Sequence, residues 1–127
     1  MEKKTILIVE DEGSLRGVLD DKLISSGFDV LEARNGLEGL TTALAKHPDL
    51  ILLDLSMPKM DGMTMLRELR KDAWGKAVPV IIMTNLPSED EKRNQDIAEL
   101  EPTYYFVKVE KSIGEVVAKI KERLENR

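Results

Sequence analysis

The sequence predicts a single α/β domain built on a doubly wound, five-stranded parallel sheet, and two features of the chain predict it. Short apolar runs without polar alternation recur along the sequence, a pattern typical of strands that are covered on both faces. Segments with apolar residues at helical spacing lie between these runs. Strands that alternate with helices form a parallel sheet through right-handed crossovers, with helices on both faces.

Five apolar runs are expected to form the strands. The three strongest are Ile6 to Val9, Leu50 to Leu53 and Val78 to Met83. Two weaker runs, Phe28 to Leu31 and Tyr104 to Val107, complete the set. Since a strand follows each helical segment except the last, the expected order is five strand-helix pairs.

Helices are expected after each strand. The first has an apolar stripe of Leu15, Val18, Leu19 and Leu23, and the second has one of Leu37, Leu40 and Leu44. The third carries Leu66 and Leu69, and the fifth carries Ile113, Val116, Val117, Ile120 and Leu124. The fourth is the polar stretch after Pro87. Asn35, Ser88 and Ser112 each precede a glutamate by three residues, which predicts a capping box. Gly27 predicts the end of the first helix.

Composition limits the classes of function. A chain of 127 residues has room for one domain, residues 1–127, and its 42% hydrophobic and 34% charged residues are typical of a soluble globular protein. The net charge of -5 argues against a nucleic-acid-binding surface. The apolar run near the N-terminus is too short for a signal peptide or a membrane span, so a cytoplasmic location is expected. Without cysteine there is no thiolate ligand, so a metal site is expected to use oxygen ligands.

Carboxylates follow the first and third strands. Glu10, Asp11 and Glu12 end the first run and Asp54 ends the third. The carboxyl ends of parallel strands meet at one edge of the sheet, where such folds bind ligands. Two like charges about 4 Å apart repel by about 4 kcal/mol at an effective dielectric constant near 20, so the cluster favours a cation. An all-oxygen ligand set suits Mg2+, although strand-end acids can also simply face solvent.

Three residues at the ends of the expected strands, Asp54, Thr84 and Lys108, are candidates for phosphoryl chemistry. Asp54 is followed by LSMPKMDG, whose Pro58 and Gly62 predict a turn that exposes the aspartate as a nucleophile. Thr84 ends the fourth run and has a hydroxyl to donate to a phosphoryl oxygen, but a β-branched residue is also ordinary in a strand. Lys108 ends the fifth run, where it either pairs with the carboxylates or extends into solvent.

Together the segments IVEDE, LLDLSMPKMDG, PVIIMTN and YYFVK, in this order, resemble the receiver domain of two-component response regulators. The resemblance covers essentially the whole chain. It implies a (βα)5 flavodoxin-like receiver fold with strand order 2-1-3-4-5, like that of a stand-alone chemotaxis regulator. It also implies a phosphoprotein of a phosphorelay that acts as a signalling switch and catalyses only its own phosphorylation and dephosphorylation, so that the chain is not otherwise an enzyme.

The resemblance assigns roles by position. Asp54 becomes the phosphoacceptor, and Asp11, Asp54 and the backbone carbonyl of Ser56 become Mg2+ ligands, with Glu10 acting through a water on the metal. Lys108 would contact the acceptor carboxylate and then the phosphoryl group. Thr84 would turn toward that group, and Tyr105 would rotate in response, although an aromatic residue at this place can also simply pack.

The implied partners follow from the same resemblance. The phosphoryl donor would be a phosphohistidine on a sensor histidine kinase or a phosphotransfer protein. Phosphorylation would change the surface around the fourth and fifth helices for a downstream protein target that the sequence does not identify. Binding of nucleic acid or membrane by this chain is not expected, and the chain would be a monomer or a weak dimer through the face of helix 4, strand 5 and helix 5.

Two residues depart from the family pattern. Val109 follows Lys108 where receivers usually have a proline with a cis peptide, and a cis bond without proline costs about 3 to 4 kcal/mol, so a trans bond is expected. Asn85 stands where a small residue is common. These departures keep open a degenerate receiver that acts as a phosphorylation-independent interaction module.

Two unrelated functions share parts of the pattern. A flavodoxin-like cofactor carrier has the same architecture, but its phosphate loop should offer donors, whereas EDEGSLRG begins with three acids. A phosphatase with an aspartate nucleophile also binds Mg2+, but it normally needs a substrate cap for which this chain has no spare length.

Overall fold

The structure, a computed structural model, describes residues 3–55, 60–84, 99, 104–107 and 113–125, with the side chains of 84 and 104–107 outside the description. Strands and helices alternate along the chain. The strands are β1 (Thr5–Val9), β2 (Asp29–Ala33), β3 (Leu50–Asp54), β4 (Val80–Thr84) and β5 (Tyr104–Val107). The helices are α1 (Gly13–Ser25), α2 (Gly36–Lys46), α3 (Gly62–Leu69) and α5 (Ile113–Glu125). The fourth expected helix, after Pro87, lies outside the described residues.

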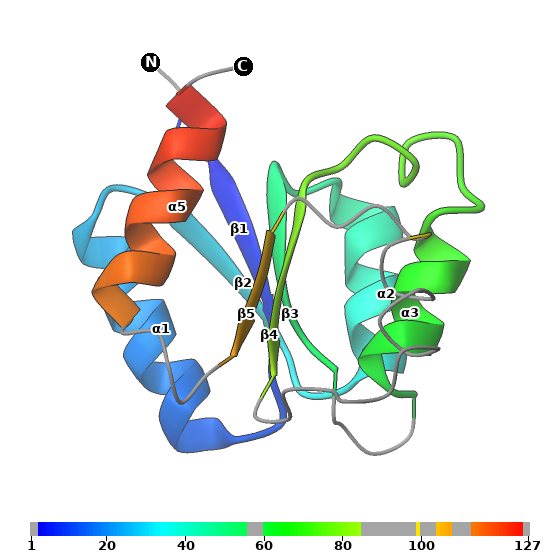
Figure 1. Ribbon diagram of the computed structural model, residues 1–127, viewed down its shortest axis with the longest axis horizontal. Coiled ribbons are helices and arrows are strands. Elements are labelled where there is room, and N and C mark those ends of the chain that lie inside the picture. Colours follow the sequence, from blue (N-terminus) through cyan, green and yellow to red (C-terminus); the bar gives the residue numbers. More distant parts are fainter. Residues whose placement is uncertain (1–2, 56–59, 85–98, 100–103, 108–112, 126–127) are drawn as a thin grey trace.

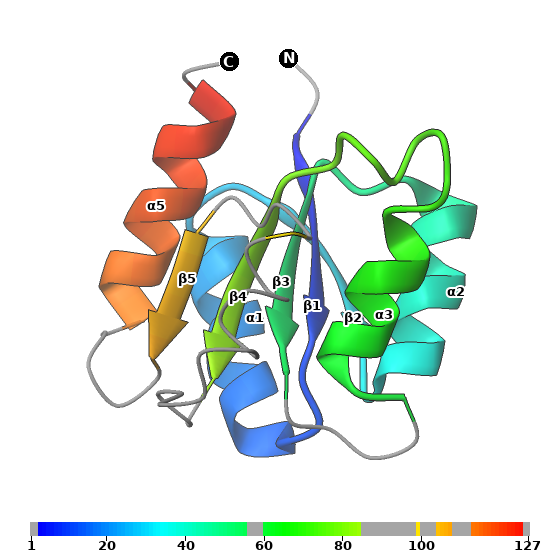
Figure 2. The ribbon, with the colours of Figure 1, turned by 45° about the vertical axis from the view of Figure 1, so that its right-hand side comes forward.

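The strands form one parallel sheet in the order β2-β1-β3-β4-β5. The expected doubly wound sheet and its strand order are therefore confirmed. Helices α1 and α5 cover one face and α2 and α3 cover the other (Figure 1). All the strands run in the same direction, so their carboxyl ends share one edge of the sheet, at the bottom of Figures 1 and 2.

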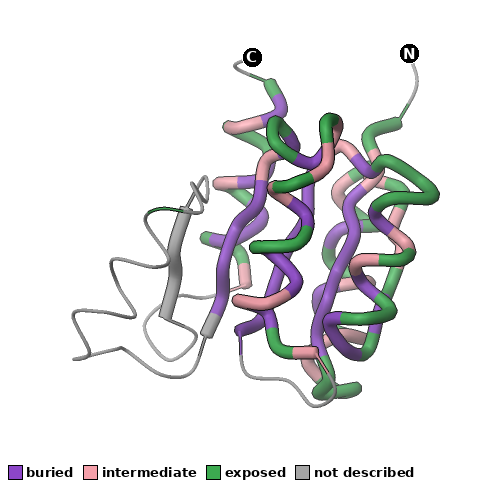
Figure 3. Tube along the Cα trace, turned by 90° about the vertical axis from the view of Figure 1, so that its right-hand side faces the viewer, coloured by how far each residue is buried: buried purple, intermediate pink, exposed green. Residues whose placement is uncertain are grey.

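Each face of the sheet carries its own apolar core, because successive side chains of a strand point to opposite faces. Leu7, Val9, Ile51, Leu53 and their neighbours pack against α2 and α3. On the other face, residues such as Ile6, Ile8, Leu50 and Leu52 pack against α1 and α5. Buried positions accordingly fill the central strands, and exposed ones follow the outer sides of the helices (Figure 3). The unbroken apolar runs of the sequence are explained by this burial on both faces.

The expected leucine stripe of α2 is wrong at Leu37 and Leu44, whereas Leu40 is partly buried and packs against the core. Leu37 is 53% exposed and Leu44 is 39% exposed, while the buried residues of this helix are Gly36, Gly39 and Ala43. A Cβ on Gly39 would stand 2.9 Å from both Val9 methyl groups, so α2 lies too close to the sheet for large side chains. Val18 of α1 is similarly exposed, at 51%, although Leu19 and Leu23 are buried as expected.

The helix boundaries follow local capping chemistry. The Asn35 side chain accepts a hydrogen bond from the Glu38 N–H at 2.9 Å, which confirms the N-terminal half of the expected capping box of α2. Asp61 caps α3 in the same way, accepting from the Thr64 N–H at 2.8 Å. Gly27, just after α1, has a φ of 98°, which a residue without a Cβ adopts at little cost, and it confirms the expected helix end.

Candidate acidic site at the carboxyl edge of the sheet

Three carboxylates meet at the carboxyl edge of the sheet. Glu10 directly follows β1 and is 2% exposed, and Asp54 ends β3 and is 4% exposed. Asp11 is exposed and lies on the loop that leads into α1. One oxygen from each of these three side chains lies within 4.8 Å of the others. The convergence that the sequence predicts for Glu10, Asp11 and Asp54 is therefore present.

The first acidic loop is held by hydrogen bonds that its backbone N–H groups donate. The Glu10 N–H donates to the Ala33 carbonyl at 3.0 Å, which extends the pairing of β1 with β2 by one residue. The Glu12 N–H then donates to the Glu10 carboxylate at 3.2 Å. Since Glu12 is the N-cap residue of α1, the loop turns from strand to helix within three residues. Asp11 stands at the middle of this turn.

The position of Asp54 depends on a close approach by the start of α3. The Gly62 N–H donates to the Leu55 carbonyl at 3.0 Å. A Cβ on Gly62 would overlap the backbone carbonyl oxygen of Asp54, so only glycine allows α3 to begin at this place. The sequence predicted a turn at Gly62, and the structure shows that this glycine supports the backbone of the proposed acceptor.

The three carboxylates fit a divalent cation. Mg2+ prefers oxygen ligands at about 2.1 Å in an octahedron, which places neighbouring ligands roughly 3 Å and opposite ones roughly 4 Å apart. The separations of up to 4.8 Å among Glu10, Asp11 and Asp54 are close to this range. Two of the carboxylates are buried and Asp11 faces solvent, so an ion held here could keep several waters. The ligand chemistry thus suits Mg2+ rather than a metal that prefers sulfur.

A family model described as the response regulator receiver domain matches residues 6–121 of this chain. The chain belongs to this family. It is therefore a receiver domain of the kind found in the response regulators of two-component signalling systems. The chain is similar to the probable transcriptional regulator ycf27 of Porphyridium aerugineum, with 43% identity over 86 residues, which cover 68% of this chain and 35% of that protein. The receiver thus matches about a third of the length of the ycf27 regulators.

Shorter relatives and solved structures agree with this assignment. Protein PilH of Pseudomonas aeruginosa is 40% identical over 87 residues, which cover 68% of this receiver and 72% of PilH. A CheY-like receiver domain protein from Methanospirillum hungatei has a crystal structure that superposes with a TM-score of 0.89 at 25% identity, covering 98% of this chain and 96% of that one. The receiver fold expected from the sequence is therefore confirmed.

The remaining residues that the sequence assigned to the receiver site are only partly described. Ser56 and Lys108 lie outside the described residues, as do Asn85 and Val109. The side chains of Thr84 and Tyr105 also lie outside them, but the backbones of both belong to strands. Thr84 pairs with Val107, and Asp54 pairs with Met83, so β4 ends beside β3 at the acidic edge. The roles of these side chains stay predictions.

Two features of the receiver site were missed by sequence reasoning. Arg16, in the first turns of α1, donates to the carbonyl of Glu10, although the sequence suggested no role for it. Asp61 caps α3 and so fixes the helix that supports Asp54. The signal for Asp61 was present, because an aspartate before a helical stripe is a common N-cap. No comparable signal pointed to Arg16, whose partners are set by the packing of α1 on the sheet.

Proposed function

We propose that this receiver is a phosphoryl-accepting switch in which the Asp54 carboxylate is the acceptor. The observation that carries the proposal is the cluster of three carboxylate oxygens within 4.8 Å at the carboxyl edge of the sheet. Asp54, which carries one of these oxygens, is the last residue of the central strand β3. Its backbone lies against Gly62 at the start of α3. The family assignment supports the same role.

In the proposed reaction, an oxygen of the Asp54 carboxylate attacks the phosphorus of a phosphohistidine. An O–P bond forms, the N–P bond breaks, and the histidine imidazole leaves and takes up a proton. Bound Mg2+ would neutralise charge on the transferring phosphoryl group. Asp11, Asp54 and the carbonyl of Ser56 would hold the ion, and Glu10 would act mainly through a water bound to it. Lys108 would offset further charge on the phosphoryl group.

The negative charge of the phosphoryl group is the basis for the structural change that we propose on phosphorylation. A phosphoryl group adds roughly -1.5 to -2 charge and strong hydrogen-bond acceptors to the edge of the sheet. We expect Thr84 to donate to it and Tyr105 to rotate, which would change the surface around the expected fourth helix, β5 and α5 for a protein partner. That surface is also where a weak dimer would form. We propose that the chain acts on no other substrate, so that it is not an enzyme in the ordinary sense.

The proposed donor is a sensor histidine kinase or a phosphotransfer protein. The ycf27 relatives are named probable transcriptional regulators, but only 35% of the Porphyridium aerugineum protein is matched here. With a net charge of -5, this chain is not proposed to bind nucleic acid itself.

No helix in the described part of the chain combines the length and apolar character needed to cross a bilayer. We propose a cytoplasmic location, where the proposed kinase or phosphotransfer protein would donate its phosphoryl group.

Intact mass spectrometry tests the proposal. The chain is incubated with acetyl phosphate in the presence of Mg2+ or of EDTA, beside a receiver known to be competent. We expect a gain of one phosphoryl group that requires Mg2+ and that Asp54→Asn abolishes. Asp29→Asn is the matched control, since it removes the same charge from an exposed residue at the start of β2. Wild-type chain that gains no phosphoryl group while the competent receiver does would instead support the phosphorylation-independent module.

A further inference from the structure

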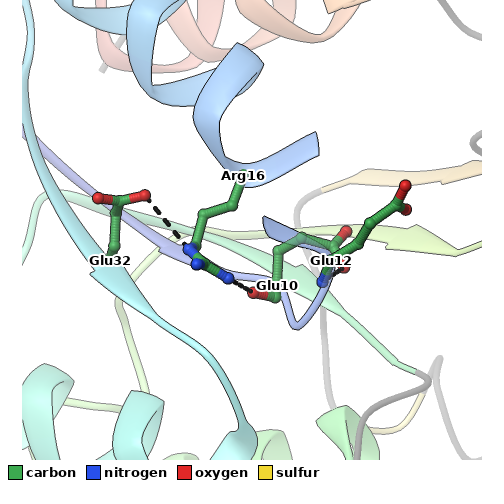
Figure 4. Close-up of polar contacts among 4 residues, drawn as sticks. All are labelled: Glu10, Glu12, Arg16 and Glu32. Atoms are coloured by element: carbon green, nitrogen blue, oxygen red, sulfur yellow. Dashed lines mark hydrogen bonds and ion pairs between the residues drawn. The ribbon is translucent and has the colours of Figure 1, made fainter. Parts of the chain in front are cut away.

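Arg16 of α1 connects the acidic loop to the neighbouring strand β2. Its guanidinium Nη1 donates to the backbone carbonyl of Glu10 at 2.8 Å, and its Nε lies 3.3 Å from a carboxylate oxygen of Glu32. Figure 4 shows the guanidinium between these two acceptors. The Arg16 side chain is only 18% exposed, so both contacts are partly shielded from water. One planar group thus joins two segments that are far apart in the sequence.

The backbone of Arg16 makes a third contact with the same loop. Its N–H donates to the carbonyl of Glu12 at 2.9 Å. This is the first intrahelical hydrogen bond of α1, which any residue with a backbone N–H makes at this position, so the arginine side chain itself acts on the carbonyl of Glu10. These contacts fix the backbone of Asp11 on both sides and leave its carboxylate exposed to a ligand.

The charge of Arg16 is unfavourable for the proposed metal. A guanidinium bonded to the Glu10 carbonyl repels a divalent cation held by the Glu10 and Asp11 carboxylates. A residue selected only to raise cation affinity would not be an arginine. Glu32 offsets part of this charge at 3.3 Å, although its side chain is 43% exposed and water screens the pair. Any favourable effect of Arg16 on metal binding therefore comes from the geometry of its contacts and not from its charge.

We propose that Arg16 is a positioning residue that fixes Glu10 and Asp11 in the arrangement that binds Mg2+, and that Glu32 holds Arg16 in place. This inference rests on the proposed function. The planar guanidinium reaches a carbonyl and a carboxylate at once through two different nitrogens. A lysine in its place keeps the charge but offers a single point donor, which cannot hold both acceptors in the same geometry.

Whether Arg16→Gln weakens or tightens Mg2+ binding distinguishes a positioning role of Arg16 from an effect of its charge. Mg2+ is titrated while the amide resonances of Glu10, Asp11 and Glu12 are followed by NMR. Removing a positive charge by Arg16→Gln should tighten Mg2+ binding if charge alone acts. If Arg16 positions the ligands, binding should instead weaken by roughly tenfold, as for other residues that orient metal ligands. Arg67→Gln, on the exposed part of α3, removes the same charge away from these contacts and should leave the affinity unchanged.

Two further variants test the contacts themselves. Arg16→Lys should weaken Mg2+ binding in the same direction as Arg16→Gln, because it keeps the charge and loses the planar fork. Glu32→Gln should weaken it by a smaller factor, and should have no added effect in the Arg16→Gln background. Wild-type affinity in Arg16→Lys, or tighter binding in Arg16→Gln, overturns the inference.

Amide hydrogen exchange without Mg2+ gives a readout that does not depend on the metal. In Arg16→Gln we expect faster exchange at Glu12 and residue 16, with the core amides of β3 unchanged. Faster exchange throughout the core would mean that Arg16 only stabilises the fold, which contradicts the inference. Wild-type chain that binds no Mg2+ overturns the proposed function itself, whereas normal wild-type binding with an unaltered Arg16→Gln affinity overturns only the role of Arg16.

Discussion

The backbone carbonyl oxygen of Asp54 lies against the Cα of Gly62, so close that a Cβ on Gly62 would overlap it. Moving either group aside is costly, since the first belongs to a central strand and the second begins a helix. This contact ties the position of the proposed phosphoacceptor to the start of α3.

Gly62→Ala should therefore destabilise the chain by about 1 to 3 kcal/mol, the usual cost of an oversized group in a packed interior. It should also slow phosphorylation of Asp54, because the strand end must shift. Urea unfolding and the acetyl phosphate reaction measure the two effects. Gly17→Ala is the matched control, since no atom lies within 4 Å of its added Cβ. That control should stabilise α1 by about 0.5 to 1 kcal/mol.

Asn35→Ala should cost about 1 kcal/mol of stability, because it removes the side-chain acceptor of the Glu38 N–H at the start of α2. Asn35→Asp keeps an acceptor at this position and should restore most of the loss. Thermal unfolding of the three proteins measures the difference. Equal stabilities of Asn35→Ala and wild type would show that the cap does not contribute.

Leu37 and Leu66 should respond very differently to truncation, although both are leucines in helices at apolar spacing. Leu37 is 53% exposed, so Leu37→Ala should change the free energy of unfolding by less than about 0.5 kcal/mol. Leu66 is fully buried, and Leu66→Ala should cost about 2 to 5 kcal/mol. Urea unfolding compares the two variants. A large loss in Leu37→Ala would contradict the packing described for α2.

Trp74 should report unfolding but not events at the acidic site. It lies in the turn that precedes β4, at the opposite edge of the sheet, and stacks on His47 with ring centroids 4.2 Å apart and planes 7° from parallel. It is the only tryptophan in the chain. Adding Mg2+ or acetyl phosphate should therefore leave its fluorescence unchanged, while His47→Ala should alter it. A response of Trp74 to Mg2+ in the folded chain would contradict this separation.

The sequence predicted most of the sheet because burial on both faces leaves an unbroken apolar run. It placed β5 at residues 104–107, as observed, and the other strands within two residues at each end. The convergence of Glu10 and Asp54 could be predicted because parallel strands end at one edge of the sheet.

Features that depend on distances between elements could not be predicted. The close approach of α2 to Val9 makes glycine and alanine the buried residues of this helix and turns Leu37 outward, against the usual rule that the leucine stripe is buried. The contact of Arg16 with Glu32 joins a helix to a strand that follows it in the sequence, and no local pattern marks it. Such relationships appear only once the elements are packed.

Strand β1 begins and helix α5 ends at the edge of the sheet away from the acidic cluster (Figures 1 and 2). Lys4, Phe28 and Leu124 line one cavity there, so the first and last described segments are neighbours. A short peptide would therefore be enough to join these two segments without crossing the acidic edge of the sheet. Because both segments lie at the edge opposite the acidic cluster, a surface or a fluorescent tag attached through either one leaves the acidic edge facing outward. This arrangement suits measurements of phosphotransfer on immobilised protein.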